Sequence, residues 1–285
     1  MSITTIDYEK EYDNRARVPE HPQIFARHAR EAEGYRKSAA LAQLGISYGA
    51  TARQIVDFFP GKGAGASAPL AMFIHGGWWR TREPASFSQL AAGANANGID
   101  FALAGYDLAP TVTIAEIVEQ MRAACAMLWR NMHKRIMVIG NSAGAHLAAC
   151  MVATDWATVA ADLPGDLVPA AYGISGVYDL APLTQISVNA DLKLDDATAR
   201  QLSPLYWSIP AGRIFDAIVG SLESSEFLRQ SRIIADAWAK RGVKTRYEVI
   251  PGVDHFTIVD LLVDPNSAMT RRTVELAKQV AAMPL

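Results

Sequence analysis

The chain has 285 residues, of which half are hydrophobic, so it is long enough to bury a sizeable core. Its formal net charge at pH 7 is −2 and it has no run of Lys or Arg, which excludes the basic surface typical of proteins that bind nucleic acids or anionic membranes. No apolar stretch approaches the roughly 20 residues that a membrane-spanning helix needs, so we expect no such helix.

Residues 1–45 are charged and have the pattern of helices rather than strands. Apolar side chains at Ile24, Phe25, Tyr35 and Leu41 could anchor them, so we predict a helical N-terminal arm or cap over the rest of the chain. The start of the chain is polar and lacks the apolar stretch of a secretory signal, which predicts a cytoplasmic protein. No linker divides the sequence, and we therefore expect a single domain over residues 1–285.

The rest of the chain alternates between short apolar stretches and helical patterns. Residues 46–48 and 54–59 are typical of two short strands at an antiparallel edge. Further strands are expected at residues 70–75, 101–106, 135–139, 170–178, 213–219 and 245–250. Helices are expected at residues 85–97, 114–131, 145–154, 226–241 and 268–282. This alternation predicts an α/β fold with a mostly parallel central sheet and helices on both faces.

The two cysteines, Cys125 and Cys150, both lie among alanines in predicted helices. This setting is typical of small buried hydrophobic residues rather than of a disulfide framework or a metal site. We expect no metal ion and no cofactor.

A serine flanked by glycines stands between a predicted strand and a predicted helix. Residues 136–146 read Ile-Met-Val-Ile-Gly-Asn-Ser-Ala-Gly-Ala-His, which contains the pattern Gly-x-Ser-x-Gly of a nucleophile elbow. In such an elbow the serine occupies a strained turn that only small neighbours allow. Ser142 is therefore the candidate nucleophile, and the amide of Ala143, at the start of the helix, is a candidate donor to an oxyanion.

A serine hydroxyl becomes nucleophilic only when a base takes its proton, and an acid must orient that base. On a fold of this kind the acid and then the histidine follow the serine along the chain, each on a loop at the carboxyl end of a strand. His255 lies in the turn after the last predicted strand and is the candidate base. Of the other histidines, we expect His21, His28 and His133 on the surface, and structural roles for His75 and His146.

Glu223 is the favoured acid, because it lies on the loop just beyond the strand at residues 213–219. Asp216 lies within that strand, roughly 10 Å lower at a rise of about 3.3 Å per residue, and should not reach the imidazole. Asp254 adjoins His255 in the sequence, but adjacent side chains on a loop usually diverge. Glu226 is expected to be an ordinary acidic residue in the first turn of a helix.

The sequence His-Gly-Gly-Trp-Trp at residues 75–79 follows a predicted buried strand. It matches the glycine-rich loop whose backbone amides face the substrate oxygen in esterases and lipases. We expect Gly76, Gly77 and Trp78 to form the oxyanion hole. Trp78 and Trp79 either pack in the core or line an aromatic pocket, and Trp79 is a candidate substrate contact.

Residues 179–212 lack a regular pattern of strands and helices. They either form a lid over the pocket together with the N-terminal arm, or are a surface loop that packs on the body without covering the pocket. Trp207 in this insert and Phe256 next to His255 are further candidates for contacting the substrate.

Several of these motifs together resemble the kynurenine formamidase (arylformamidase) family and, more broadly, the hormone-sensitive-lipase-like branch of the α/β-hydrolases. The similar segments, in the order of the family, are residues 75–79, 141–147, 175–180, 223–231 and 252–256. The resemblance implies an α/β-hydrolase fold, Ser142 as nucleophile, His255 as base, and oxyanion donors from the amides of Gly77 and Trp78 with Ala143. The family commonly has aspartate at the position of the acid, where this chain has a longer glutamate.

The resemblance also implies an activity, which is hydrolysis of an N-formyl arylamine, N-formyl-L-kynurenine in the case of the family, through an acyl-enzyme. The alternative is a carboxylesterase, amidase or carbamate hydrolase with the same triad. A more remote alternative is a non-catalytic ligand receptor with this fold. The expected partner is a small aryl amide or ester, and we expect no binding to nucleic acid or membranes. The sequence leaves open whether the protein forms a homodimer.

Overall fold

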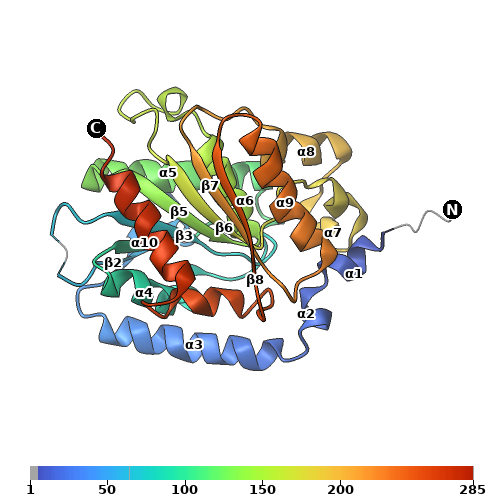
Figure 1. Cartoon of the computed structure of the whole chain (residues 1–285), viewed down its shortest axis with the longest axis horizontal. Helices are drawn as coiled ribbons and strands as arrows, with labels where there is room; N and C mark the ends of the chain where they lie inside the picture. The colour runs from blue at the N-terminus through green and yellow to red at the C-terminus, as the bar shows by residue number, and fades with distance from the viewer. Residues whose placement is uncertain (1–5, 64, 285) are drawn as a thin grey trace.

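An eight-stranded sheet with the strand order β1-β2-β4-β3-β5-β6-β7-β8 forms the centre of the protein (Figure 1). The computed structural model describes residues 6–63 and 65–284. The strands are β1 (Gln43–Ser47), β2 (Ile55–Phe59), β3 (Leu70–Ile74), β4 (Asp100–Ala104), β5 (Ile136–Asn141), β6 (Ala170–Ile174), β7 (Ile214–Gly220) and β8 (Lys244–Ile250). β2 pairs antiparallel with β1 and β4, whereas all the other pairs are parallel, which confirms the predicted mostly parallel sheet with an antiparallel edge.

Helices cover both faces of the sheet and divide the core into two clusters. The first cluster contains α5 (Ile114–Met132), α6 (Ala143–Ala153) and α9 (Ser225–Ala239). The second contains α4 (Ala91–Ala96) and α10 (Ala268–Ala281). Every residue of the five central strands β3 to β7 is buried, as their nearly continuous apolar sequences predict for strands covered on two sides.

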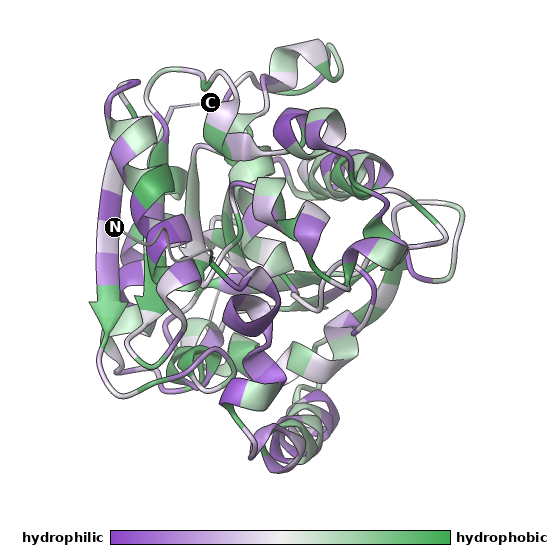
Figure 2. Cartoon of the chain, turned by 90° about the vertical axis from the view of Figure 1, so that its right-hand side faces the viewer, coloured by the Kyte–Doolittle hydropathy of each residue, from purple (hydrophilic) through white to green (hydrophobic). Residues whose placement is uncertain are grey.

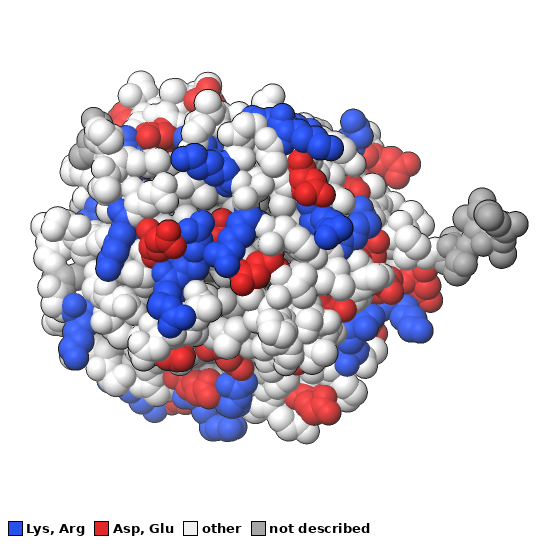
Figure 3. Space-filling model, in the orientation of Figure 1, with Lys and Arg blue, Asp and Glu red and all other residues white. Residues whose placement is uncertain are grey.

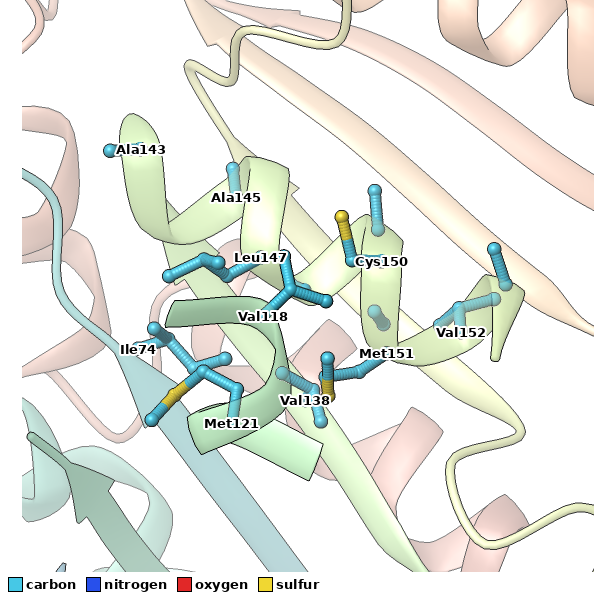
Figure 4. Close-up of a cluster of buried hydrophobic side chains, with 14 of the residues drawn as sticks. Ile74, Val118, Met121, Val138, Ala143, Ala145, Leu147, Cys150, Met151 and Val152 are labelled. Atoms are coloured by element: carbon cyan, nitrogen blue, oxygen red, sulfur yellow. The ribbon is translucent and has the colours of Figure 1, made fainter. Parts of the chain in front are cut away.

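Packing between α5 and α6 holds the centre of the first cluster together. Val118 and Met121 of α5 lie close to Leu147 and Met151 of α6, above Val138 of β5 (Figure 4). α6 is buried along its whole length, so the helix that follows the candidate nucleophile is fixed in the core. Cys125 and Cys150 are buried in α5 and α6, and burial raises the pKa of both thiols, in agreement with the structural role expected for them.

A predicted helix and a predicted strand differ in extent or type from the sequence-based expectations. Residues 85–97 form a 3₁₀ helix, η1 (Pro84–Leu90), followed by the short α4, because the Ser88 hydroxyl donates to the carbonyl of Ala85 and competes with regular helical bonds. The strand expected at residues 170–178 ends at Ile174, since Ser175 adopts a left-handed conformation with φ of 53°.

The N-terminal segment forms α1 (Tyr8–Tyr12), α2 (Asn14–Arg17) and α3 (His21–Ser38), which run along one side of the molecule (Figure 1). The predicted helical arm over residues 1–45 ends earlier than expected, because residues 43–45 already belong to β1. Most helices around the sheet carry hydrophilic as well as hydrophobic residues (Figure 2), and positive and negative side chains are intermixed on the face that carries α3 and α10 (Figure 3). No helix within the described residues could span a membrane.

Residues 179–212 consist of short helical turns between β6 and β7. They are η3 (Ala181–Gln185), α7 (Asn189–Leu192), α8 (Asp196–Gln201) and η4 (Pro204–Tyr206). Another 3₁₀ turn, η5 (Ile258–Leu262), follows β8 and leads into α10.

Candidate active site

Ser142 stands at a sharp turn between β5 and α6, with φ of 57° and ψ of −121°. A residue with a side chain rarely adopts this conformation, so the surrounding structure must hold it there. Glycine is required on both sides: a Cβ atom on Gly140 would lie 2.1 Å from the carbonyl oxygen of Gly144, and one on Gly144 would lie 2.0 Å from the carbonyl oxygen of Ile74. β3, β5 and α6 can therefore close tightly around the serine.

The glycine-rich loop after β3 passes directly beside Ser142. A Cβ atom on Gly76 would lie 2.8 Å from the Cβ atom of Ser142. Gly77 and Trp78 have φ values of 109° and 57°, which turn the backbone of the loop. In the part of the chain that the structure describes, the amides of Gly77, Trp78 and Ala143 donate to no protein acceptor. These amides are therefore free to bind a developing oxyanion.

The structure brings Glu223 and His255 together. Nδ1 of His255 donates to Oε2 of Glu223 at 2.7 Å, and the carboxylate is fully buried. Oε1 of the same carboxylate accepts from the amide of Gly220 at 2.7 Å and from the hydroxyl of Ser175 at 2.6 Å. Because Nδ1 keeps its proton and donates a hydrogen bond to the carboxylate, Nε2 of the imidazole is left as the proton acceptor.

Ser142 and His255 line one and the same cavity. Within the described residues, no hydrogen bond joins the hydroxyl of Ser142 to the imidazole of His255. In catalytic serine–histidine pairs this bond is often long until the substrate is in place. The imidazole itself is held by aromatic neighbours, because its ring centroid lies 4.5 Å from that of Phe227 and 5.5 Å from that of Phe256.

The cavity has a volume of about 390 Å³, which is enough for one aryl group with a short side chain. Its walls come from the N-terminal arm, the loop at residues 76–82, the insert and the loop of His255. The aromatic residues in its lining are Tyr12, Phe25, Trp78, Phe87 and Phe256. The cavity can therefore hold a flat ring close to the hydroxyl of Ser142.

Two of the tryptophans expected to contact a substrate do not line the cavity. Trp79 is completely buried and packs edge-on against His146, with the ring centroids 5.1 Å apart. Trp207 donates its indole N–H to the carbonyl of Gln201 and packs within the insert. The prediction that Trp79 and Trp207 contact a substrate in the pocket is therefore wrong. Phe256, the third candidate, does line the cavity.

The other acids lie away from the imidazole of His255. Asp216 of β7 pairs with Arg272 at 2.7 Å on the other side of the sheet. Asp254 accepts from the amides of Phe256 and Thr257 and so stabilises the turn that carries His255. Glu226 lies in the first turn of α9, as expected, and in addition it is buried and accepts from the hydroxyl of Tyr12 at 3.2 Å.

One histidine expected on the surface is buried in the cavity wall. His28 of α3 is only 7% exposed and donates from Nε2 to Oδ1 of Asp260 at 2.6 Å. The sequence pattern did not indicate this, because its partner is 232 residues away in the chain. His75 and His146 are buried, as their expected structural roles require.

Sequence reasoning missed the contributions of Ser175, Tyr12 and Phe25. Ser175 is the first residue of a segment that resembles known formamidases, so the sequence indicated that its position matters. It did not indicate the contact of Ser175 with Glu223. Tyr12 and Phe25 belong to the arm, which the sequence placed over the body without assigning its side chains to the pocket.

Comparisons with known proteins show the family of the chain. A family model described as alpha/beta hydrolase fold matches residues 71–259. A kynurenine formamidase of Salmo salar is 29% identical over 257 residues, covering 86% of this chain and 85% of that protein. A kynurenine formamidase of Danio rerio is 29% identical over 250 residues, covering 84% and 83%. The resemblance inferred from the sequence motifs is thereby confirmed.

Solved structures show the same fold. A crystal structure from Silicibacter sp. TM1040, of a protein provisionally named a thioesterase, has a TM-score of 0.83 and 30% identity over 94% of this chain and 98% of its own. An esterase of the bacterial hormone-sensitive lipase family has a TM-score of 0.69 at 18% identity, over 93% of this chain and 99% of its own.

Proposed function

The chain belongs to the alpha/beta hydrolase fold family, and we propose that it is a serine hydrolase that removes the formyl group from an N-formyl arylamine such as N-formyl-L-kynurenine. The observation that carries this proposal is the cavity lined by the strained Ser142, by Gly77 and Trp78 of the glycine-rich loop and by His255, whose imidazole is bound to the buried Glu223. The relatives named kynurenine formamidases support the formyl arylamine as the substrate.

In the first half of the reaction, Nε2 of His255 takes the proton from the hydroxyl of Ser142 while Oγ attacks the formyl carbon. The carbonyl oxygen becomes an oxyanion that accepts hydrogen bonds from the amides of Gly77, Trp78 and Ala143. The imidazolium then donates its proton to the aniline nitrogen, and the C–N bond breaks to leave a formyl ester on Ser142.

In the second half, a water molecule gives a proton to His255 and attacks the formyl ester. The same amides bind the second oxyanion, and the imidazolium returns its proton to Oγ as formate leaves. Glu223 stays ionised and stabilises the imidazolium in both halves.

The test is release of formate and arylamine from N-formyl-L-kynurenine by the purified protein. The wild type should cleave it, and Ser142→Ala should lower kcat by about 10⁴-fold or more with an unchanged Tm, since it removes the nucleophile and keeps the fold. Brisk hydrolysis of p-nitrophenyl acetate together with no cleavage of any formyl arylamine would show that the substrate is wrong although the triad is right.

Hydrolysis of an ester or thioester by the same residues is the second candidate. The relative provisionally named a thioesterase, 30% identical over nearly its whole length, favours it. The ratio of kcat/KM for an aryl acetate to that for a formanilide separates the two, because an alcohol or thiol leaves with less help from the imidazolium than an aniline nitrogen does.

A further inference from the structure

Arg82 lies in the cavity wall directly beside the oxyanion loop. A Cβ atom on Gly77 would lie 2.9 Å from Cγ of Arg82, so the stem of the arginine passes against this loop. The guanidinium carbon lies 3.8 Å from the centroid of the Phe25 ring on α3. The cation is therefore held in one place by a cation–π contact, between the oxyanion loop and the N-terminal arm.

This cation has no counter-ion among the residues that the structure describes. Within the described residues, the guanidinium groups of Arg82 and of Arg15, which also lines the cavity, form neither an ion pair nor a hydrogen bond. Burial and then the neighbouring Arg15 lower the pKa of Arg82. By contrast Arg80, two residues earlier in the same loop, is paired with Asp191 at 2.6 Å.

The two acids in the lining are already engaged elsewhere. Glu9 accepts from the amide of Ser187 at 2.6 Å, and Asp13 accepts from the amide of Ala16 at 3.0 Å. Among the described residues, neither acid forms an ion pair with Arg82 or Arg15, so no carboxylate of the protein directly neutralises these two guanidinium groups. A half-buried cation without a partner is unfavourable in the empty cavity, and an anion bound next to it would remove that cost.

We propose that Arg82, with Arg15 beside it, binds a carboxylate of the substrate, so that the site selects N-formyl arylamines that carry an acidic side chain. This inference rests on the proposed function, because it assigns the substrate class of the same cavity. A planar guanidinium can bind a carboxylate through two parallel hydrogen bonds, and stacking on Phe25 keeps it oriented for this. Arg82 is thus a specificity-determining residue that acts on binding.

The test compares N-formylkynurenine with its decarboxylated analogue N-formylkynuramine, which keeps the aryl ring, the formyl group and the amine. The wild type should prefer the substrate with the carboxylate by about 10- to 100-fold in kcat/KM, as expected for a charge-assisted bond. Arg82→Gln should lose this preference through KM, with kcat for both substrates within about twofold of the wild type. Arg82→Lys should retain part of it.

Arg80→Gln is the matched control, since it makes the same change in charge at an arginine that already has a partner, and the preference should persist. Equal losses on both substrates in Arg82→Gln would overturn the inference and assign Arg82 a structural role.

If the wild type cleaves neither compound, the proposed function fails, and the carboxylate site is then tested by calorimetric titration with L-kynurenine and kynuramine. Tighter binding of L-kynurenine that disappears in Arg82→Gln would support the site. Equal affinities would overturn it.

Discussion

Three hydrogen bonds fix the carboxylate of Glu223, and they offset the greater flexibility of its longer side chain. A glutamate side chain has one more rotatable bond than the aspartate common at this position in formamidases, so it loses more rotamer freedom when fixed. The amide of Gly220 and the hydroxyl of Ser175 hold Oε1, while His255 binds Oε2. With both oxygens occupied, the longer acid keeps the imidazole in one orientation.

Ser175→Ala tests this view of Ser175 as a positioning residue. The variant removes one of the two donors to Oε1 while the amide of Gly220 remains, so kcat should fall by about tenfold, and less than in Glu223→Gln. The measurement is kcat and its pH profile, whose acidic limb should move because the carboxylate that stabilises the imidazolium has changed.

Ser231→Ala is the control for Ser175→Ala. Ser231 is also buried, but within the described residues its hydroxyl has no hydrogen-bond partner. Its removal should leave kcat and the pH profile unchanged. If both serine variants reduce kcat equally, Ser175 has no particular role in orienting the acid.

The sequence predicts residues well where chain order and local pattern determine their position. Ser142 lies in a pattern of small residues, and Glu223 and His255 lie on loops after strands, so the spacing alone indicates them. The direction of a side chain is harder to predict. Trp79 is buried and packs against His146, whereas Trp78, with nearly the same φ, lines the cavity. Neither the local backbone nor the neighbouring sequence distinguishes the two tryptophans.

At the scale of elements, α1 connects the two halves of the site. The ring of Tyr12 packs edge-on against Trp78 of the oxyanion loop, with centroids 5.9 Å apart, and against Phe227 at 5.5 Å, which itself contacts His255. Its hydroxyl donates to Glu226 and accepts from Gln230 of α9. The hydrogen bonds between Tyr12 and α9 join residues more than 200 positions apart, which is why a local pattern predicts the arm but not its contacts with the site.

Tyr12→Leu should therefore lower kcat/KM for the formyl arylamine by about tenfold or more, because the oxyanion loop and the imidazole lose a shared support. Tyr12→Phe keeps both ring contacts and should retain most of the activity. The control is Tyr35→Leu in α3, whose hydroxyl donates to Asn95 at 2.6 Å outside the lining of the cavity. It should lower Tm without lowering kcat/KM, and parallel losses in the two leucine variants would contradict the special role of α1.

At the scale of the whole molecule, the sheet could be predicted from sequence because its strands are short apolar stretches at regular intervals. The insert at residues 179–212 could not, because its short turns depend on side-chain contacts rather than on periodicity. An example is Asn189, whose amide donates to the carbonyl of Leu194 at 2.9 Å and whose side-chain oxygen accepts from the amide of the same residue. The insert is also bound to the body, because His146 of α6 donates to the carbonyl of Leu202 at 2.7 Å and Trp238 of α9 donates to that of Pro204 at 3.2 Å.

We expect two buried histidines to make the stability of the whole protein depend on pH. His75 lies before the oxyanion loop and His146 lies in α6 after Ser142; burial lowers the pKa of each to about 4. Each is hydrogen-bonded through one nitrogen, to the carbonyl of Gly76 or of Leu202, while the other nitrogen has no partner among the described residues. Protonation would therefore place a charge in the core without a counter-ion.

Between about pH 6.5 and pH 4 the unfolded chain binds protons at these histidines and the folded chain does not, so acid favours unfolding. The free energy of unfolding should fall by up to about 1.4 kcal/mol per pH unit for each histidine, measured as the urea midpoint at about pH 7 and about pH 5. His146→Gln keeps a donor toward Leu202 but cannot titrate, and should reduce the difference between the two midpoints by roughly half. His133→Gln, at the exposed end of α5, should keep the full difference. An unchanged difference in His146→Gln would show that other groups make the protein sensitive to acid, and that His146 is not forced to remain neutral in the core.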